Sequence, residues 1–285
     1  MKMKRELPKL FSLLAVRGLE ATRYKIPGDF EALGLPSLRE LDFLYRHMKR
    51  YAVRLLLHQL LSAYPKGVSI GGLSRYGSHS SSKKFLEEAI LHGIVEEKGT
   101  EFYSRLNGSI RIGDLLEWYV AELFFREMGL EVIYSAGLRG GGTGGDYDVL
   151  ATDGARLVYL EIKSAPPKGI HVAAIKQFLK RTKSLLPDIA IFFNDTHLRM
   201  RDKIVLMFEE ALVELGGIAV LKTLPVERVQ EQIFHIGHYL YILNSRRNLL
   251  KNFQVVFRDY LAYTSIKNDI WELFVKGELN NDSKS

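Results

Sequence analysis

The chain of 285 residues contains no cysteine and has no long apolar run. The absence of cysteine excludes disulfides, thiolate zinc sites, iron–sulfur clusters and cysteine nucleophiles. Apolar runs such as Leu55–Leu57 and Ile189–Phe193 are far shorter than the roughly 20 residues that span a bilayer. The first residues also lack the apolar core of a secretory signal. We therefore expect a cytoplasmic, intracellular protein that makes no membrane contact.

Several nucleotide and hydrolase signatures are missing as well. The glycine-rich stretch 139–145 lacks the GK[ST] of a P-loop and does not join a strand to a helix as GxGxxG does, so we predict a loop and no ATPase activity. No G-x-S-x-G motif is present. His235 and His238 lie three residues apart in an expected helix, but no third ligand is near them in sequence. We interpret them as core or surface histidines.

The net charge of +7 is unevenly distributed along a chain of globular composition. Residues 1–112 contain 19 Lys and Arg against 11 Asp and Glu, a balance of +8, whereas the remaining 21 and 22 balance to −1. A basic module joined to a neutral one suggests a domain that binds a polyanion such as nucleic acid. The alternative is a solvated basic surface.

Residues 37–112, which follow an N-terminal extension over 1–36, alternate between helical and hairpin patterns. We expect a helix over 37–64 that Ser37 caps, a short segment over 69–77, a helix over 80–92 and a hairpin turning at 98–99. This order resembles a winged helix-turn-helix domain in pattern only, and the resemblance makes 80–92 the recognition helix. The alternative is a structural winged helix used for dimerisation. The candidate nucleic-acid contacts are Ser80, Ser81, Lys83, Lys84 and, on the wing, Lys98.

From residue 113 onward, helices and strands alternate, which predicts an α/β sheet domain over 113–225. Residues 226–285 are expected to form a C-terminal helical region, with aromatic side chains along 226–277. We interpret this region as a helical cap on the sheet or a dimer interface, and a nucleic-acid stacking surface is the alternative. The expected elements are a helix over 113–129, strands over 131–138, 146–152 and 156–164, a helix over 172–186, a strand over 189–195, a helix over 200–216 and a last strand over 218–224.

Charged residues interrupt two apolar strands of the predicted hairpin. Alternation along a strand places Asp146 and Asp148 on one face, and it does the same for Glu161 and Lys163. If the two strands pair through the turn at 153–154, these polar ends meet. Half-buried charges need partners, and two neighbouring carboxylates are ligands that Mg²⁺ prefers. The alternative is a surface ion pair of Lys163 with Glu161 and Asp148.

The spacing of Asp148 and the triplet Glu161-Ile162-Lys163 resembles the active site of the PD-(D/E)XK nuclease superfamily. The likeness covers about residues 113–195, where the order of helices and strands also matches. One departure is that Tyr147 precedes Asp148, where the motif has proline.

Two helices extend the resemblance. The helix over 113–129 is similar to the first core helix of the family, whose Glu adds to the metal site; Glu117 is the best match and Glu122 the second. The helix over 172–186 carries Lys176 and Gln177 where many members have an extra Lys or Gln. Gln177 is thereby a candidate catalytic residue, and Lys176 a candidate nucleic-acid contact.

The resemblance implies a restriction-endonuclease-like αβββαβ core with a mixed sheet and a Mg²⁺-dependent endonuclease that cuts DNA. Asp148 and Glu161 would bind Mg²⁺ together with the backbone carbonyl of Ile162, and Mn²⁺ is expected to substitute. Lys163 would orient or deprotonate the attacking water and stabilise developing charge. Glu117 would act in the metal site or beside it.

The biological role and the partners remain open at this level. The domain order resembles that of methyl-directed type IV restriction enzymes, although their usual Gln is absent at Glu161, and a repair or recombination nuclease acting on branched DNA is the alternative. Because cutting both strands of a duplex needs two active sites, we expect a homodimer. A further protein partner is left open. A non-catalytic DNA-binding or scaffold protein with a nuclease-like fold, and RNA as the substrate, are the remaining alternatives.

Overall fold

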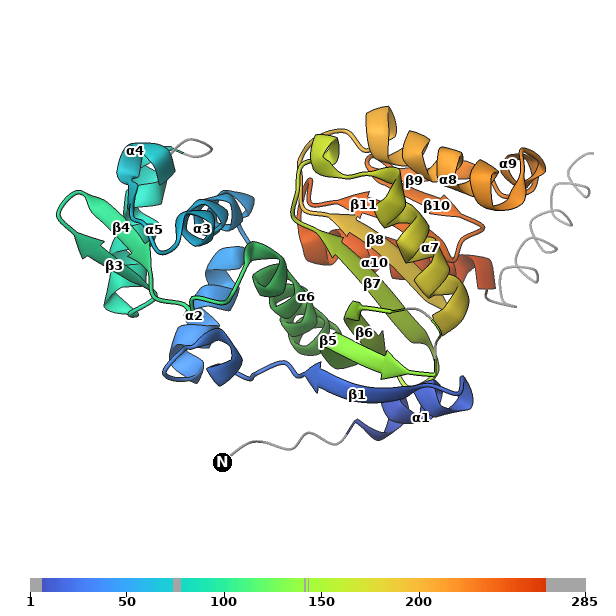
Figure 1. Cartoon of the computed structure of the whole chain (residues 1–285), viewed down its shortest axis with the longest axis horizontal. Helices are drawn as coiled ribbons and strands as arrows, with labels where there is room; N and C mark the ends of the chain where they lie inside the picture. The colour runs from blue at the N-terminus through green and yellow to red at the C-terminus, as the bar shows by residue number, and fades with distance from the viewer. Residues whose placement is uncertain (1–6, 74–77, 141, 143, 265–285) are drawn as a thin grey trace, which may run out of the picture.

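The computed structural model describes residues 7–73, 78–140, 142 and 144–264, and it has an α/β fold built on an eight-stranded mixed sheet (Figure 1). The strand order is β1-β5-β6-β7-β8-β11-β10-β9. Strands β7, β8 and β11 run parallel to one another, and the remaining neighbours are antiparallel. The strands are β1 (Glu20–Lys25), β5 (Glu131–Arg139), β6 (Asp146–Thr152), β7 (Leu157–Lys163), β8 (Ile189–Asn194), β9 (Val226–Gln230), β10 (Ile233–Ile236) and β11 (Leu240–Asn244).

Helices cover both faces of this sheet, and alternation along the strands explains why. In β7, Val158 and Leu160 belong to the hydrophobic cluster under α6 (Ile112–Met128) and α10 (Leu249–Thr264). Leu157 and Tyr159 belong to the cluster under α1 (Pro8–Val16), α7 (Val172–Leu185) and α8 (Leu206–Gly216). A strand buried on both faces reads as a continuous apolar run, which is the pattern of β7 and β8.

The N-terminal module forms a smaller unit beside α6 (Figure 1). Its sheet has the order β2-β4-β3. Its hydrophobic core is continuous with the core under α6, since Leu57 and Phe85 belong to the same cluster as Leu116 and Phe124. The elements are α2 (Leu38–Met48), α3 (Tyr51–Ala63), β2 (Val68–Ser69), α4 (Ile70–Leu73), α5 (His79–Leu91), β3 (Val95–Lys98) and β4 (Glu101–Ser104), preceded by the short helix Glu31–Leu33.

The single helix expected over 37–64 is wrong, because the chain breaks between α2 and α3. Arg50 is extended there (φ −91°, ψ 122°). The Nη1 of Arg54 donates to the carbonyl oxygen of Met48 at 2.7 Å, which satisfies the end of α2. The Nε and Nη2 of the same guanidinium bind both oxygens of Asp195, which follows β8. The break therefore depends on a residue 141 positions away along the chain, which local sequence patterns do not reveal.

The expectations for residues 218–248 are also wrong. Residues 219–223 form a short helix, α9 (Ala219–Thr223), rather than the last strand, and the place beside β8 is taken by β11. Residues 226–244 form three strands instead of helix. Left-handed residues, among them Glu231 (φ 44°), Gly237 (φ 60°) and His238 (φ 56°), make the turns between them. His235 and His238 thus lie on β10 and in the following turn, not on a helix.

Beyond these strands the helical expectation is confirmed for α10, whose Phe253 packs edge-on against Phe124 of α6. Trp271 and Phe274, the last aromatic residues of the expected helical region, lie outside the described residues. The sheet also takes in β1 from the N-terminal extension, so it draws on residues on both sides of 113–225. None of the helices in the described part of the chain combines the length and apolar character that crossing a membrane requires.

Candidate active site

Asp148 lies where strands β6 and β7 separate. Their ladder pairs Val149 with Leu160 and stops there. Beyond that point the amide of Ile162 donates to Asp148 Oδ2 at 2.6 Å. Tyr147 and Val149 pack in different hydrophobic clusters although they are two residues apart, so β6 is irregular at Asp148. This irregularity sends Asp146 away from Asp148, toward an exposed ion pair with Arg23.

Glu161 and Lys163 lie on the same side of β7, as the alternation predicts. Lys163 Nζ donates to Glu161 Oε1 at 2.6 Å. Glu161 is buried, and the hydroxyl of Tyr159 donates to its second oxygen. The carbonyl of Lys163 accepts from Asn194 Nδ2 at 2.9 Å and from the amide of Asp195 at 2.8 Å. These bonds fix the end of β7 against the end of β8.

Glu117 projects from α6 toward the same region. Its Oε2 accepts from the hydroxyl of Ser135 at 2.5 Å. Ser135 has a left-handed backbone (φ 47°) within β5, where the pairing skips from Tyr134 to Ala136. A non-glycine residue held in this region is strained, and here the strain aims a hydroxyl at a carboxylate.

Glu122, the second choice on this helix, has a different role. It is fully buried and accepts from Trp118 Nε1 and from the amide of Gly28. It also pairs with Arg126 one turn further along α6. Glu122 therefore ties the N-terminal segment to α6 and is not part of the acid centre, a name we use for Glu117, Asp148 and Glu161.

Like charges in the acid centre shift its titration. Burial raises the pKa of Asp148 well above its usual range, and the carboxylates of Glu161 and Glu117 raise it further. Burial also raises the pKa of Glu117 to about 7, although the hydrogen bond from Ser135 opposes this shift. Strongly perturbed carboxyls gathered in one place are typical of functional sites.

Helix α7 brings a residue that the sequence reasoning missed. Arg181 Nη1 donates to Glu161 Oε2 at 3.0 Å, and its guanidinium lies 5.7 Å from the ring centre of Tyr147. Gln177 lies one turn before Arg181, so both are on the same face, and this half-buried amide has no hydrogen bond within the described ranges. Lys176 instead pairs with Glu214 of α8. The sequence feature that could have identified Arg181 is its spacing of four residues from Gln177, which places both on one helix face.

A half-open cleft of about 540 Å³ adjoins the acid centre. It lies between the end of α3 and the start of α6, and it reaches Ser164 directly after β7. Glu117 is one of its lining residues. The cleft therefore connects the acid centre with the N-terminal module. The full lining is Leu61, Ser62, Arg111, Ile112, Gly113, Asp114, Glu117 and Ser164.

The predicted nucleic-acid contacts on α5 lie around its exposed first turns. Ser80 and Ser81 are exposed, and the amide of Ser81 donates to the capping hydroxyl of Ser78. Lys83 approaches Glu87 at 3.9 Å. Lys84 is exposed and has no ion pair with any residue that the structure describes.

On the β3–β4 hairpin, Lys98 is less available. It pairs with Glu96 at 3.2 Å and lies over the ring of Tyr103. The neighbouring Glu97 and Glu101 add negative charge to the same hairpin, so this hairpin is a weaker candidate for contact with phosphates than the start of α5.

No family model matches the chain, and no curated protein matches it in sequence. Among solved structures, the crystal structure of protein VC1899 from Vibrio cholerae is similar over 87% of this chain, with 14% sequence identity and a TM-score of 0.49. The chain spans 62% of the length of that neighbour.

Proposed function

We propose that the protein is a metal-dependent nuclease that hydrolyses phosphodiester bonds in DNA. The observation that carries the proposal is the convergence of Asp148, Glu161 and Glu117, with Lys163 beside them, at the point where β6 and β7 separate. In this proposal, the run from α6 through β5, β6, β7 and α7 to β8 is a restriction-endonuclease-like core, and residues 37–112 are a winged helix.

The donor set fits a hard divalent cation such as Mg²⁺. Asp148 and Glu161 supply carboxylate oxygens, which this cation prefers, and the Ile162 carbonyl and Glu117 are further oxygen donors. The raised pKa of Asp148 reflects burial and repulsion from Glu161 and Glu117, and a cation would relieve both. Mn²⁺ has similar ligand preferences and is expected to substitute. When bound, the cation would lower the pKa of water and polarise the scissile phosphate.

Side chains of the protein would orient the water, the phosphate and the metal-binding carboxylates. Lys163, whose side chain is partly exposed, can leave Glu161 to donate to a phosphate oxygen or to orient the attacking water. Arg181 and Tyr159 hold Glu161 from the other side. Gln177 offers a free amide one turn away, and Ser135 holds Glu117 in place.

The proposal is tested by cleavage of supercoiled plasmid, linear duplex, single strands and branched junctions with Mg²⁺. Lys163→Met, Asp148→Asn and Glu161→Gln should each lower the rate by about 10²–10⁴-fold, because each removes charge needed in the transition state. Lys222→Met is the control: it removes an exposed lysine on α9, and it should keep most of the activity. Calorimetry should show Mg²⁺ binding lost in Asp148→Asn and retained in Lys163→Met.

Two results would overturn the proposal. A wild-type cleavage rate in Lys163→Met would show that Lys163, the central residue of the proposal, takes no part in catalysis. The absence of Mg²⁺ binding and of any cleavage, with salt-sensitive DNA binding intact, would favour a non-catalytic DNA-binding or scaffold protein. Cleavage of RNA alone would change the substrate class.

The preferred substrate also separates the restriction and repair roles. Cleavage of both strands would need two active sites, so we expect a homodimer under cleavage conditions, measured by light scattering. Preference for junctions would favour repair or recombination.

A further inference from the structure

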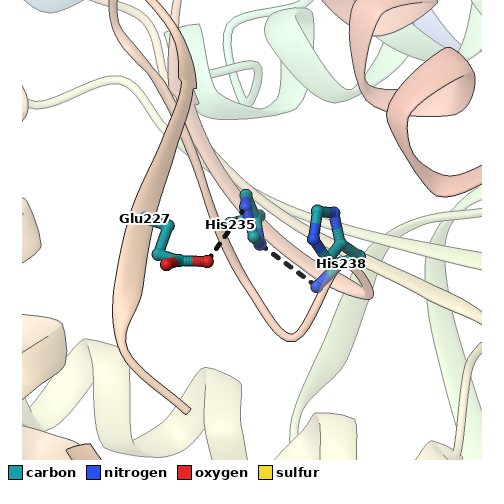
Figure 2. A group of neighbouring side chains, drawn as sticks. All are labelled: Glu227, His235 and His238. Carbon is teal, nitrogen blue, oxygen red and sulfur yellow. Dashed lines mark hydrogen bonds and ion pairs between the residues drawn. The ribbon is translucent and has the colours of Figure 1, made fainter. Parts of the chain in front are cut away.

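A second group of ligand-bearing side chains lies at the far edge of the main sheet. Glu227 of β9 pairs directly with His235 of β10, and His238 follows in the next turn (Figure 2). One ligand atom from each of these three residues lies within 4.8 Å of the others. We call Glu227, His235 and His238 the histidine cluster.

The ligand atoms of this cluster lie somewhat farther apart than atoms around a shared ion. His235 Nε2 lies 3.8 Å from Glu227 Oε2, too far for a hydrogen bond. Two atoms bound to one tetrahedral Zn²⁺ at about 2.0–2.1 Å lie about 3.3 Å apart. The two imidazoles are stacked, with ring centres 3.8 Å apart. Binding therefore requires His238, the more exposed ring, to tilt out of the stack.

A carboxylate behind His238 favours the tautomer that a metal needs. The Nδ1 of His238 lies 2.9 Å from Oδ2 of Asp259, a residue of α10. Because a carboxylate accepts the hydrogen bond, Nδ1 carries the proton and Nε2 keeps a free lone pair. The hydroxyl of Tyr241 also donates to Asp259 at 2.8 Å. A ligand imidazole held by a carboxylate is the usual arrangement around protein metals.

His235 is buried, whereas the side chains of Glu227 and His238 on either side of it are more exposed. The Nδ1 of His235 accepts from the amide of His238 at 3.2 Å. Coordination through Nε2 would place the ring proton on Nδ1, so this hydrogen bond would be lost and the amide of His238 would shift away from the ring, in the same movement that tilts His238 out of the stack.

We infer that the histidine cluster is a Zn²⁺ site, separate from the acid centre. Two imidazoles and one carboxylate are a zinc-type set rather than a magnesium-type set. Three protein ligands leave one position for water. The ion would link the edge strand β9 to β10 and, through Asp259, to α10.

The experiment titrates ZnCl₂ by calorimetry into Asp148→Asn protein, in which the acid centre is weakened, with excess Mg²⁺ present. We expect one Zn²⁺ per chain. Adding Glu227→Gln or His238→Asn should lower the affinity at least tenfold, and Asp259→Asn about 10–100-fold. Asparagine at 238 tolerates the left-handed backbone. His79→Gln, which removes an exposed histidine on α5, is the control and should not change binding.

Melting of the metal-free variants separates loss of ligand from loss of fold. Variants that melt at the same temperature as the parent without metal, but no longer gain stability from Zn²⁺, support the site. No Zn²⁺ binding by the parent, or equal binding in Glu227→Gln and His238→Asn, overturns it. Since every protein in the titration carries Asp148→Asn, a failure here is independent of the outcome of the nuclease test.

Discussion

The adjacent ends of the parallel strands β7 and β8 carry two kinds of buried charge. At the end of β8, both oxygens of Asp195 are bound by Arg54, and both side chains are nearly inaccessible. At the end of β7, the carboxyls of Glu117, Asp148 and Glu161 raise one another's electrostatic energy. The first group is internally neutral, whereas the second contains an excess of like charge. Paired charge therefore holds the N-terminal module to the sheet, whereas the acid centre contains three carboxyls against the two cations Lys163 and Arg181, as the proposed metal site requires.

Breaking the paired group should produce the largest change in stability. Arg54→Met leaves the carboxylate of Asp195 buried without its partner, which typically costs 3–5 kcal/mol. We expect a loss of about that size in the free energy of unfolding, measured by urea denaturation with magnesium absent. The double variant Arg54→Met, Asp195→Leu should lose less than the sum of the two single variants.

The exposed pair Lys83–Glu87, with both side chains 63% exposed, is the control for this comparison. Lys83→Met should change stability by no more than about 0.5 kcal/mol. Additive losses in the double variant would mean that Arg54 and Asp195 do not act as a pair.

These two groups also show which parts of the molecule are readable from the sequence. The alternation in 146–152 and 156–164 predicts a hairpin, and its charged residues mark Asp148, Glu161 and Lys163 as neighbours. Glu117 is added to them by the resemblance to the nuclease superfamily, not by the pattern of the helix over 113–129. The bond from Arg54 to Asp195 and the left-handed Ser135 depend on packing between distant segments, which no local pattern encodes.

The error in 226–244 has a different origin. Val226 and Val229 lie three residues apart, which is a helical spacing. The strand signal is confined to the β-branched Ile233 and Ile236 and to Gly237 after them, and the aromatic residues along the stretch obscured it. As a result, the edge of the sheet and the histidine cluster on it were not expected.

Removing a carboxylate from the acid centre should raise the free energy of unfolding, whereas breaking the Arg54–Asp195 pair should lower it. The pKa of Glu117 is about 7 in the folded chain against 4.5 for a free side chain, so the folded state holds a proton that the unfolded state has lost. Metal-free stability therefore falls as pH rises from about 4.5 to 7, and the penalty is complete above 7. Glu117→Gln should remove this penalty and raise the free energy of unfolding at pH 8 by roughly 1–3 kcal/mol.

The measurement is urea denaturation of both proteins at pH 5 and pH 8 in EDTA. The gain should be present at pH 8 and nearly absent at pH 5, and Mg²⁺ should reduce it by stabilising the wild type more than the variant. An equal gain at both pH values would show that packing, not charge, separates the two proteins.

Among the buried charged groups, the smallest stability change is expected at Arg181, which pairs with Glu161 of the acid centre. Arg181→Met removes one donor from Glu161, but Tyr159 and Lys163 still bind that carboxylate. The loss in unfolding free energy should be about 1 kcal/mol, well below that of Arg54→Met. Cleavage should nevertheless fall about 10–100-fold, because Glu161 loses the partner that orients it. Arg181→Lys should recover part of the rate by restoring the charge, whereas a stability loss as large as that of Arg54→Met with normal cleavage would place Arg181 among the structural charges.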